Sequence, residues 1–352
     1  MLKDKRLFHL DALRIISSVF VIVIHICILN WYTLSPTSLS WQALNVFESI
    51  SQVAVPVFFM ISGALYLDEN KEITIKEILL KRIPRLLIVY FVWSFVYLMI
   101  SPEKSFGSSV FKLLDGHFHM WFIPAIIGLY LVIPFLRVIV KSETLTKYFL
   151  ILSVIFTFTI YFVAPLLEGS SVKVFSLAGE VLGMLKSKLA LRMVLGYSGY
   201  FVFGYFLQKT AFSKVVRRII YLMGISALLS TICFSYLISV HRNKATDVFY
   251  SNTSLNILIE SVAIFVFAKY NLCFKNIGDK GAKTLTFLSK CTFGVYLVHP
   301  VFIDIINKHF HISAVTVNPL VAVPLYTLAV LILSFSVSAL LNKIPFVKKY
   351  IV

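Results

Sequence analysis

Two residues that could do chemistry lie within the first long apolar run of the sequence. Arg14 and His25 are eleven positions apart, in a stretch composed mainly of Ile, Val, Phe and Leu. In an α-helix eleven residues turn through about 1100°, within about 20° of three full turns, and advance about 16 Å. Both side chains are therefore predicted to lie on one helix face, together with Asp11 and Ser18. This stripe indicates a polar path from the inner surface into the outer half of a membrane.

These two residue types could supply a general base and a cation. Histidine has a pKa in the right range to take a proton from a hydroxyl group. An oxygen that gains negative charge during a reaction requires a hydrogen-bond donor or a cation. Simpler interpretations remain open. Arg14 could anchor the helix at the inner surface, and His25 could hydrogen-bond a neighbouring helix.

A group of cations, Lys81, Arg82 and Arg85, lies at the start of the third apolar run. Three cations within five residues, with Pro84 among them, suit a phosphate ligand, because guanidinium groups pair well with phosphate oxygens. Such a group is also typical of a topology signal at the inner membrane surface.

Further polar side chains precede the fourth apolar run and lie within the ninth. His117 and His119 come just before Trp121, which fits the aromatic belt at a membrane interface. No carboxylate or cysteine cluster completes a ligand set around the two histidines, so no metal is expected. Tyr296 and His299 are three positions apart and share a helix face, where a buried imidazole requires a partner.

Two other runs contain polar or small residues that packing alone could explain. In the second run, the pair Ser62 and Gly63 allows another backbone to approach closely. In the eighth run, Glu260 and Asn256 lie one turn apart and could form a structural hydrogen-bonded cluster.

The elements that must position these residues are membrane-spanning helices. Of the 352 residues, 59% are hydrophobic and only 14% are charged, whereas a soluble domain has about 25% charged residues. The runs are continuously apolar and not alternating, which argues against a sheet. The sequence predicts an all-α integral membrane protein, a bundle of about ten transmembrane helices. The predicted segments are 10–31, 46–67, 84–101, 119–139, 148–168, 191–208, 219–240, 255–271, 291–311 and 318–341.

The basic residues predict the orientation of these helices. The 33 Lys and Arg residues lie between the apolar runs and not on one amphipathic face, which argues against a nucleic-acid partner and favours anionic membrane lipids. With the N-terminus inside, 24 of them lie at inner helix ends and 9 at outer ends. The N-terminus and Val352 are therefore expected in the cytoplasm. Residues 1–352 are expected to form a single membrane domain with no appended soluble domain.

The motifs, taken in order, resemble the acyltransferase 3 family of multi-spanning membrane acyltransferases. The resemblance extends over about residues 8–305 and is specific through the order and spacing of its parts. It rests on Arg14 and His25 with ten residues between them, the Phe58-Phe59-Met60-Ile61-Ser62-Gly63 run, the Arg82-x-x-Arg85 pair, the His119-Met120-Trp121-Phe122 segment and the Gly294-x-Tyr296-x-x-His299 segment.

This resemblance implies transfer of an acyl group, usually acetyl, from cytoplasmic acyl-CoA to a hydroxyl of an extracytoplasmic carbohydrate or lipid-linked glycan. The location it implies is a bacterial plasma (inner) membrane. It also implies that His25 is catalytic and that Arg14, Arg82 and Arg85 handle the donor. The expected assignments are His25 and Arg14 as catalytic, Lys81, Arg82 and Arg85 as cofactor-binding, and Ser62, His119, Trp121, Tyr296 and His299 in the substrate cavity.

The alternative function is a transporter or exporter of a small solute or a lipid-linked glycan. Intramembrane charge and a kinked helix fit either class of protein. The cytoplasmic pair Arg82 and Arg85, beside a path that ends at His25, favours the acyltransferase, because a transporter needs no CoA site.

Overall fold

The computed structural model describes residues 6–100, 105–168, 172–189, 196–272, 274 and 277–351. Throughout these residues the chain forms helices and their connections, without a strand. Nine helical segments in this part of the chain are long and apolar enough to cross a membrane. The prediction of an all-α, multi-pass membrane protein is confirmed.

In chain order, with short 3₁₀ or π turns labelled η, the helical segments are α1 (Phe8–Trp31), α2 (Leu39–Ser51), α3 (Ala54–Tyr66), α4 (Ile75–Glu77), η1 (Ile78–Arg82), α5 (Ile83–Ile100), α6 (Phe106–Asp115), η2 (Phe118–Trp121), α7 (Phe122–Ile139), α8 (Glu143–Leu152), η3 (Ser153–Thr159), α9 (Ile160–Glu168), α10 (Lys173–Leu189), α11 (Ser198–Lys209), α12 (Lys214–His241), η4 (Val248–Tyr250), α13 (Leu255–Asn271), α14 (Asp279–Phe310), α15 (Pro319–Leu341) and α16 (Pro345–Tyr350).

Nine of the ten predicted segments correspond to a spanning helix, and the exception is 191–208. Its described residues form α11, whose 12 residues extend about 18 Å and are too short to span a membrane alone. Residues 191–195 lie outside the described residues, as do residues 1–5 and Val352, for which a cytoplasmic location is predicted. Helix α10 is an addition to the predicted set, because its charged residues interrupt any continuous apolar run.

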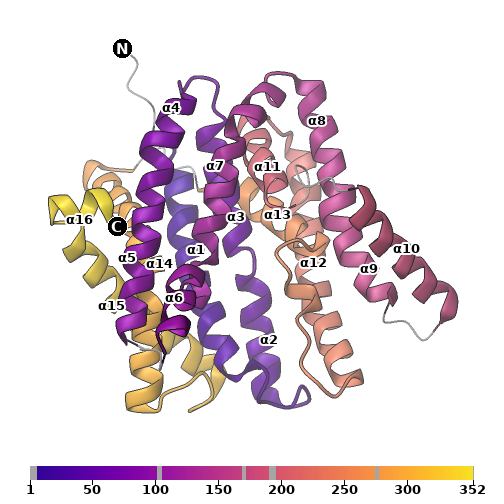
Figure 1. Ribbon diagram of the computed structural model, residues 1–352. Helices are drawn as coiled ribbons and strands as arrows, with labels where there is room; N and C mark the ends of the chain where they lie inside the picture. The colour runs from indigo at the N-terminus through magenta and orange to yellow at the C-terminus, as the bar shows by residue number, and fades with distance from the viewer. Residues whose placement is uncertain are drawn as a thin grey trace.

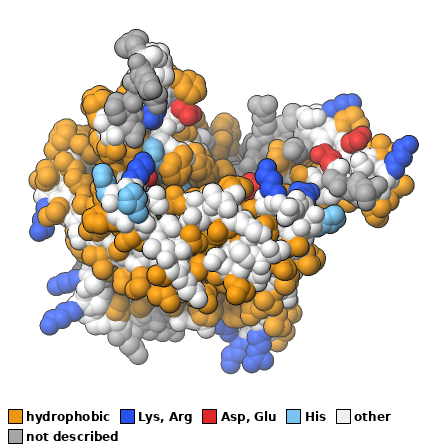
Figure 2. All heavy atoms as spheres, turned by 90° about the horizontal axis from the view of Figure 1, so that it is seen from below, with side chains coloured by type: hydrophobic (Ala, Val, Ile, Leu, Met, Phe, Trp, Pro, Cys, Tyr) orange, Lys and Arg blue, Asp and Glu red, His pale blue; other side chains and the backbone are white. Residues whose placement is uncertain are grey.

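Helix α1 lies in the middle of the bundle, packed against α2, α3, α13, α14 and α15 (Figure 1). We call the side where α1 begins, at the top of Figure 1, the α1 start side, and the opposite side the α1 end side. Helices α9 and α10 form a hairpin at one edge of the bundle, and α15 and α16 lie at the opposite edge. Seen from the α1 end side, apolar side chains cover much of the face and its edge, with charged side chains in small groups (Figure 2). Because α1 is central, its polar side chains point into protein and not into lipid.

Helices α3 and α11 cross at two glycines. A Cβ atom on Gly63 would lie 1.8 Å from the carbonyl oxygen of Phe201, and one on Gly204 would lie 1.9 Å from that of Met60. Only glycine permits this backbone approach. The predicted close contact at Ser62 and Gly63 is confirmed, and it fixes α3 beside the site.

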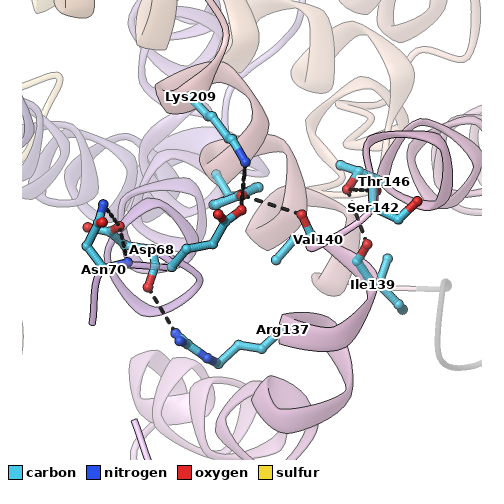
Figure 3. Close-up of polar contacts among 10 residues, drawn as sticks. Asp68, Asn70, Arg137, Ile139, Val140, Ser142, Thr146 and Lys209 are labelled. Atoms are coloured by element: carbon cyan, nitrogen blue, oxygen red, sulfur yellow. Dashed lines mark hydrogen bonds and ion pairs between the residues drawn. The ribbon is translucent and has the colours of Figure 1, made fainter. Parts of the chain in front are cut away.

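The connection after α3 is held by side chains at the ends of α7 and α11 (Figure 3). Arg137 donates hydrogen bonds to the carbonyl oxygens of Tyr66, Asp68 and Lys71 at 2.7–3.1 Å. Tyr66 is the last residue of α3 and the other two carbonyls follow it, so Arg137 supplies donors that a helix C-terminus lacks. The Lys209 ammonium is 2.6 Å from the carboxylate of Glu69 and lowers the pKa of that group through their hydrogen bond.

The intramembrane carboxyl of Glu260 belongs to a hydrogen-bonded cluster between α12 and α13. Thr231 donates to Oε1 of Glu260 at 2.7 Å, and the amide of Asn256 donates to the Thr231 hydroxyl at 2.8 Å. All three residues are buried. The structural interpretation of Glu260 and Asn256 agrees with these contacts.

Candidate active site

A single cavity of about 980 Å³ extends through the bundle beside α1. Its lining includes Arg85 and Lys290 near the α1 start side, and Tyr32 and Asp247 near the α1 end side. The walls come from α1, α2, α3, α5, α7, α9 and α14, together with η1, η2 and the segment around η4. Segments far apart in the sequence thus surround one cavity that polar and apolar side chains line together.

Eight of the ten residues that the sequence singled out line this cavity. They are Arg14, His25, Ser62, Arg82, Arg85, His119, Trp121 and Tyr296. The two others, Lys81 and His299, lie outside the lining. Lys81 is exposed, and His299 is fully buried behind His25.

The stripe on α1 is formed as the helical periodicity predicts. Arg14 and His25 both line the cavity, about 16 Å apart along the helix axis. His25 is six residues before the end of α1, so it lies about 9 Å from that end. The Arg14 guanidinium has no hydrogen bond or ion pair with any described residue, and it also borders a second cavity of about 740 Å³ at the α1 start side. It is therefore available to a ligand.

Three imidazole rings gather at the level of His25. The ring of His299 stacks on that of His25, with centroids 5.1 Å apart, and the ring of His119 is 5.4 Å from that of His299. The Nδ1 atom of His299 lies 2.8 Å from the carbonyl oxygen of Tyr296. A carbonyl can only accept, so Nδ1 carries the proton and donates. Nε2 of His299 has no partner among the described residues.

Tyr296 connects the imidazole group to the opposite wall. Its hydroxyl donates to the carbonyl oxygen of His119 at 2.8 Å. Nδ1 of His119 is in turn 2.9 Å from Nδ1 of His117, just outside the predicted span. Burial lowers the pKa of His117 to about 4, a shift that Asp304 partly opposes. This histidine is therefore neutral near pH 7.

The cations of the cavity differ in how they are held. Arg82 donates to the Glu77 carboxylate at 2.7 Å and to the Tyr66 hydroxyl at 3.0 Å. The Tyr66 hydroxyl also accepts from that of Tyr130 at 2.9 Å. Arg82 is the last residue of η1 and lines the cavity, whereas Lys81, the residue before it, is exposed. Lys290 joins the arginines in the lining, although its sequence neighbourhood resembles a plain topology signal.

The other end of the cavity carries carboxyl groups and aromatic rings in place of cations. Glu48 is buried; its Oε1 accepts from Gln52 at 2.8 Å, and its Oε2 has no partner among the described residues. Asp247 lies at the rim near the hydroxyl of Tyr32. Burial and this carboxylate raise the pKa of Tyr32. Trp121 and Tyr197 supply flat apolar surfaces, with ring centroids 5.7 Å apart.

This geometry suits the joining of two ligands that approach from opposite sides. Cations at one end match an anionic, phosphate-bearing ligand. Aromatic faces and hydrogen-bonding groups at the other end match a ligand rich in hydroxyls. An imidazole that can take a proton lies between them. No group of three or more ligating His, Cys, Asp or Glu side chains is found in the part of the chain that the structure describes.

Comparison with known proteins identifies the chemistry. A family model described as an acyltransferase domain matches residues 8–339. The chain belongs to this acyltransferase family. The match covers nearly the whole sequence, and the protein is an acyltransferase embedded in a membrane. Comparison with curated proteins and with solved structures gave no match.

Several residues of the acyltransferase cavity were missed by sequence reasoning. Glu48 and Asp247 are absent from the predicted set, although a carboxyl within a long apolar helix is a signal that could have found Glu48. Asp247 follows α12 in a polar connection, where nothing in the sequence distinguishes it. Tyr66 and Tyr130 become relevant only once α3, α5 and α7 are seen to converge.

Proposed function

We propose that this acyltransferase moves an acyl group, most simply acetyl, from cytoplasmic acyl-CoA to a hydroxyl of an extracytoplasmic carbohydrate or lipid-linked glycan. The observation that carries the proposal is the single cavity, with cations at one end, His25 in its wall and carboxyl and aromatic groups at the other end. Among named enzymes, the stand-alone O-acetyltransferase of enterobacterial common antigen is the comparison that the sequence motifs suggest.

The proposed orientation places the α1 start side in the cytoplasm of a bacterial plasma membrane. The distribution of Lys and Arg supports it. Helix α1 begins on this side, and α16, which follows α15, contacts Arg85 there through the carbonyl oxygen of Lys348. The cavity end with Arg14, Arg82, Arg85 and Lys290 then faces the compartment that contains acyl-CoA, and the end with Glu48 and Asp247 faces the acceptor.

His25 is the proposed general base. In the neutral form, one of its nitrogens can take the proton from the acceptor hydroxyl as the oxygen attacks the thioester carbonyl. The C–S bond then breaks, the sulfur leaves as CoA thiolate or thiol, and an ester forms. Stacking on His299 and contact with the ring of Phe118, both at 5.1 Å, hold the imidazole in place.

The donor end of the cavity would hold the phosphates of CoA. Arg14 has no side-chain partner among the described residues and can steer the polar part of the donor toward His25. To bind a phosphate, Arg82 must either give up its hydrogen bonds to Glu77 or donate to Glu77 and the phosphate together. The second arrangement is possible because a guanidinium has five N–H donors. Arg85 lies at the same mouth and contacts the carbonyl oxygen of Lys348 at 3.4 Å.

The test uses the purified protein in detergent with acetyl-CoA. We expect wild type to bind acetyl-CoA and to hydrolyse it slowly when no acceptor is present. His25→Ala should bind acetyl-CoA normally and lose hydrolysis, because no base remains to activate water. The matched control is His309→Ala, which removes an exposed histidine from the end of α14 and should retain wild-type hydrolysis. Failure of wild type to bind acetyl-CoA, or normal hydrolysis by His25→Ala, would refute the proposal.

A further inference from the structure

A separate basic pocket of about 430 Å³ lies at the α1 start side, against the cavity. Lys283 and Lys290 reach it from α14 and Lys348 from α16, while Asn342 lines it just after α15. One carboxyl, that of Asp279, is also in the lining. Three ammonium groups against one carboxylate leave a net charge of about two positive units.

These lysines lack the ion pairs that three other lysines at helix ends form. Lys147, Lys209 and Lys308 each form an ion pair with a carboxylate at 2.6–2.7 Å. In contrast, the side chains of Lys283, Lys290 and Lys348 have no hydrogen bond or ion pair with any described residue. A topology signal needs cations on one side of the membrane, but it does not require three unpaired lysine side chains to line the same pocket.

The pocket is adjacent to the donor end of the cavity. Lys290 lines both spaces. Arg85, which lines the cavity, donates to the carbonyl oxygen of Lys348, which lines the pocket. Along α14, Lys283 is sixteen residues before His299, which stacks on His25, so the pocket lies about 24 Å from the level of the base. A ligand that reaches both must be long and carry its anionic group at the far end.

We propose that this pocket binds the 3′-phosphate of the acyl-CoA donor, while Arg82 and Arg85 face its diphosphate. The inference rests on the proposed function, because it assumes CoA as the donor. A phosphate monoester has three terminal oxygens and nearly two negative charges near pH 7, which match the net charge of the pocket. Lysine binds such a group as a point charge from several directions, without the planar geometry that arginine requires.

The phosphate of an anionic lipid headgroup is the alternative ligand for this pocket. Such a headgroup carries a phosphodiester with one negative charge, and it is abundant at the membrane surface. The two sources are separable because dephospho-CoA differs from CoA only in lacking the 3′-phosphate. The proposal requires the pocket to respond to that difference.

The experiment measures the affinity of the full chain for CoA and for dephospho-CoA in nanodiscs. The key variant is the double substitution Lys283→Ala with Lys348→Ala, which spares Lys290 because that residue also lines the cavity. The control is Lys343→Ala, an exposed lysine on the same side that does not line the pocket. Nanodiscs of phosphatidylcholine alone, and with phosphatidylglycerol added, provide the lipid comparison.

Wild type and Lys343→Ala are expected to bind CoA more than tenfold more tightly than dephospho-CoA, since each phosphate–lysine bond is charge-assisted. In the double variant the two affinities should converge, with that for dephospho-CoA unchanged. Retention of the CoA preference in the double variant would overturn the assignment, as would equal weakening of both ligands. Equal binding of CoA and dephospho-CoA by wild type, with phosphatidylglycerol lowering both affinities, would assign the pocket to lipid. If wild type bound neither nucleotide, the proposed function itself would fail.

Discussion

Replacing Gly204 with alanine tests the crossing of α3 and α11. The new Cβ atom would lie 1.9 Å from the carbonyl oxygen of Met60, whereas Cβ contacts shorter than 3.0 Å are essentially never seen. The two backbones must therefore move apart by at least 1.1 Å, the difference between these distances. The obstructing atom is backbone, so no side-chain rotation relieves the clash. Overpacking of this kind costs about 1–3 kcal/mol, and we expect the upper end of that range.

The matched control is Gly128→Ala in α7, where an added Cβ atom has no neighbour within 4 Å. There alanine should stabilise the protein by about 0.5–1 kcal/mol, because it restricts the unfolded chain and favours the helix. The assay is thermal unfolding of the purified protein in detergent, followed by its helical circular dichroism. Gly204→Ala should melt below wild type and Gly128→Ala at or above it. Equal melting temperatures for the two variants would show that α3 and α11 do not pack through this glycine.

Three further changes test Arg137 at the connection after α3, His117 beside His119, and Arg85 at the donor end of the cavity. Arg137→Ala should lower the melting temperature, because it removes three hydrogen bonds that a cation donates, and each bond contributes at most about 3 kcal/mol. The control Lys141→Ala changes an exposed lysine nearby and should leave the melting temperature unchanged. Because the folded pKa of His117 is about 4 against an ordinary 6.5, the unfolded chain takes up the proton first. Stability should therefore fall as pH drops from about 6.5 to about 4, by less than about 3 kcal/mol, and His117→Asn should remove this part of the pH dependence of melting. Arg85→Ala should weaken CoA binding about 10- to 100-fold, measured by titration, while Lys81→Ala, outside the cavity, should bind CoA as wild type does. Normal CoA affinity in Arg85→Ala with weakened affinity in Lys81→Ala would contradict the assignment of Arg85 to the donor end.

Helical periodicity predicted the part of the site that lies on a single helix. The eleven-residue spacing of Arg14 and His25 sufficed to place both side chains in one cavity, because α1 is regular and central. The Ser62-Gly63 pair likewise predicted a close backbone contact, which the approach of Phe201 to Gly63 confirms. Apolar run length predicted nine spans. It failed for 191–208, where α11 has only 12 residues.

What sequence reasoning could not supply is the convergence of distant segments. Lys81 and Arg82 are adjacent residues of η1, and only Arg82 lines the cavity. His299 shares a helix face with Tyr296 as predicted, yet it supports His25 from behind and does not line the cavity. Asp247 joins the site because the connection between α12 and η4 brings it to the cavity. Such contacts depend on tertiary packing, which residue spacing within one helix does not predict.

In the proposed mechanism an acyl group passes from a donor on the α1 start side to an acceptor on the other side, with His25 as the base. The most direct measurement uses inside-out membrane vesicles from a host that contains the acceptor, given acetyl-labelled acetyl-CoA in the medium. Wild-type vesicles should accumulate label in luminal material, in a form released by mild alkali as an ester is, and His25→Ala vesicles with equal amounts of protein should not. Equal luminal ester label in wild-type and His25→Ala vesicles would contradict the account.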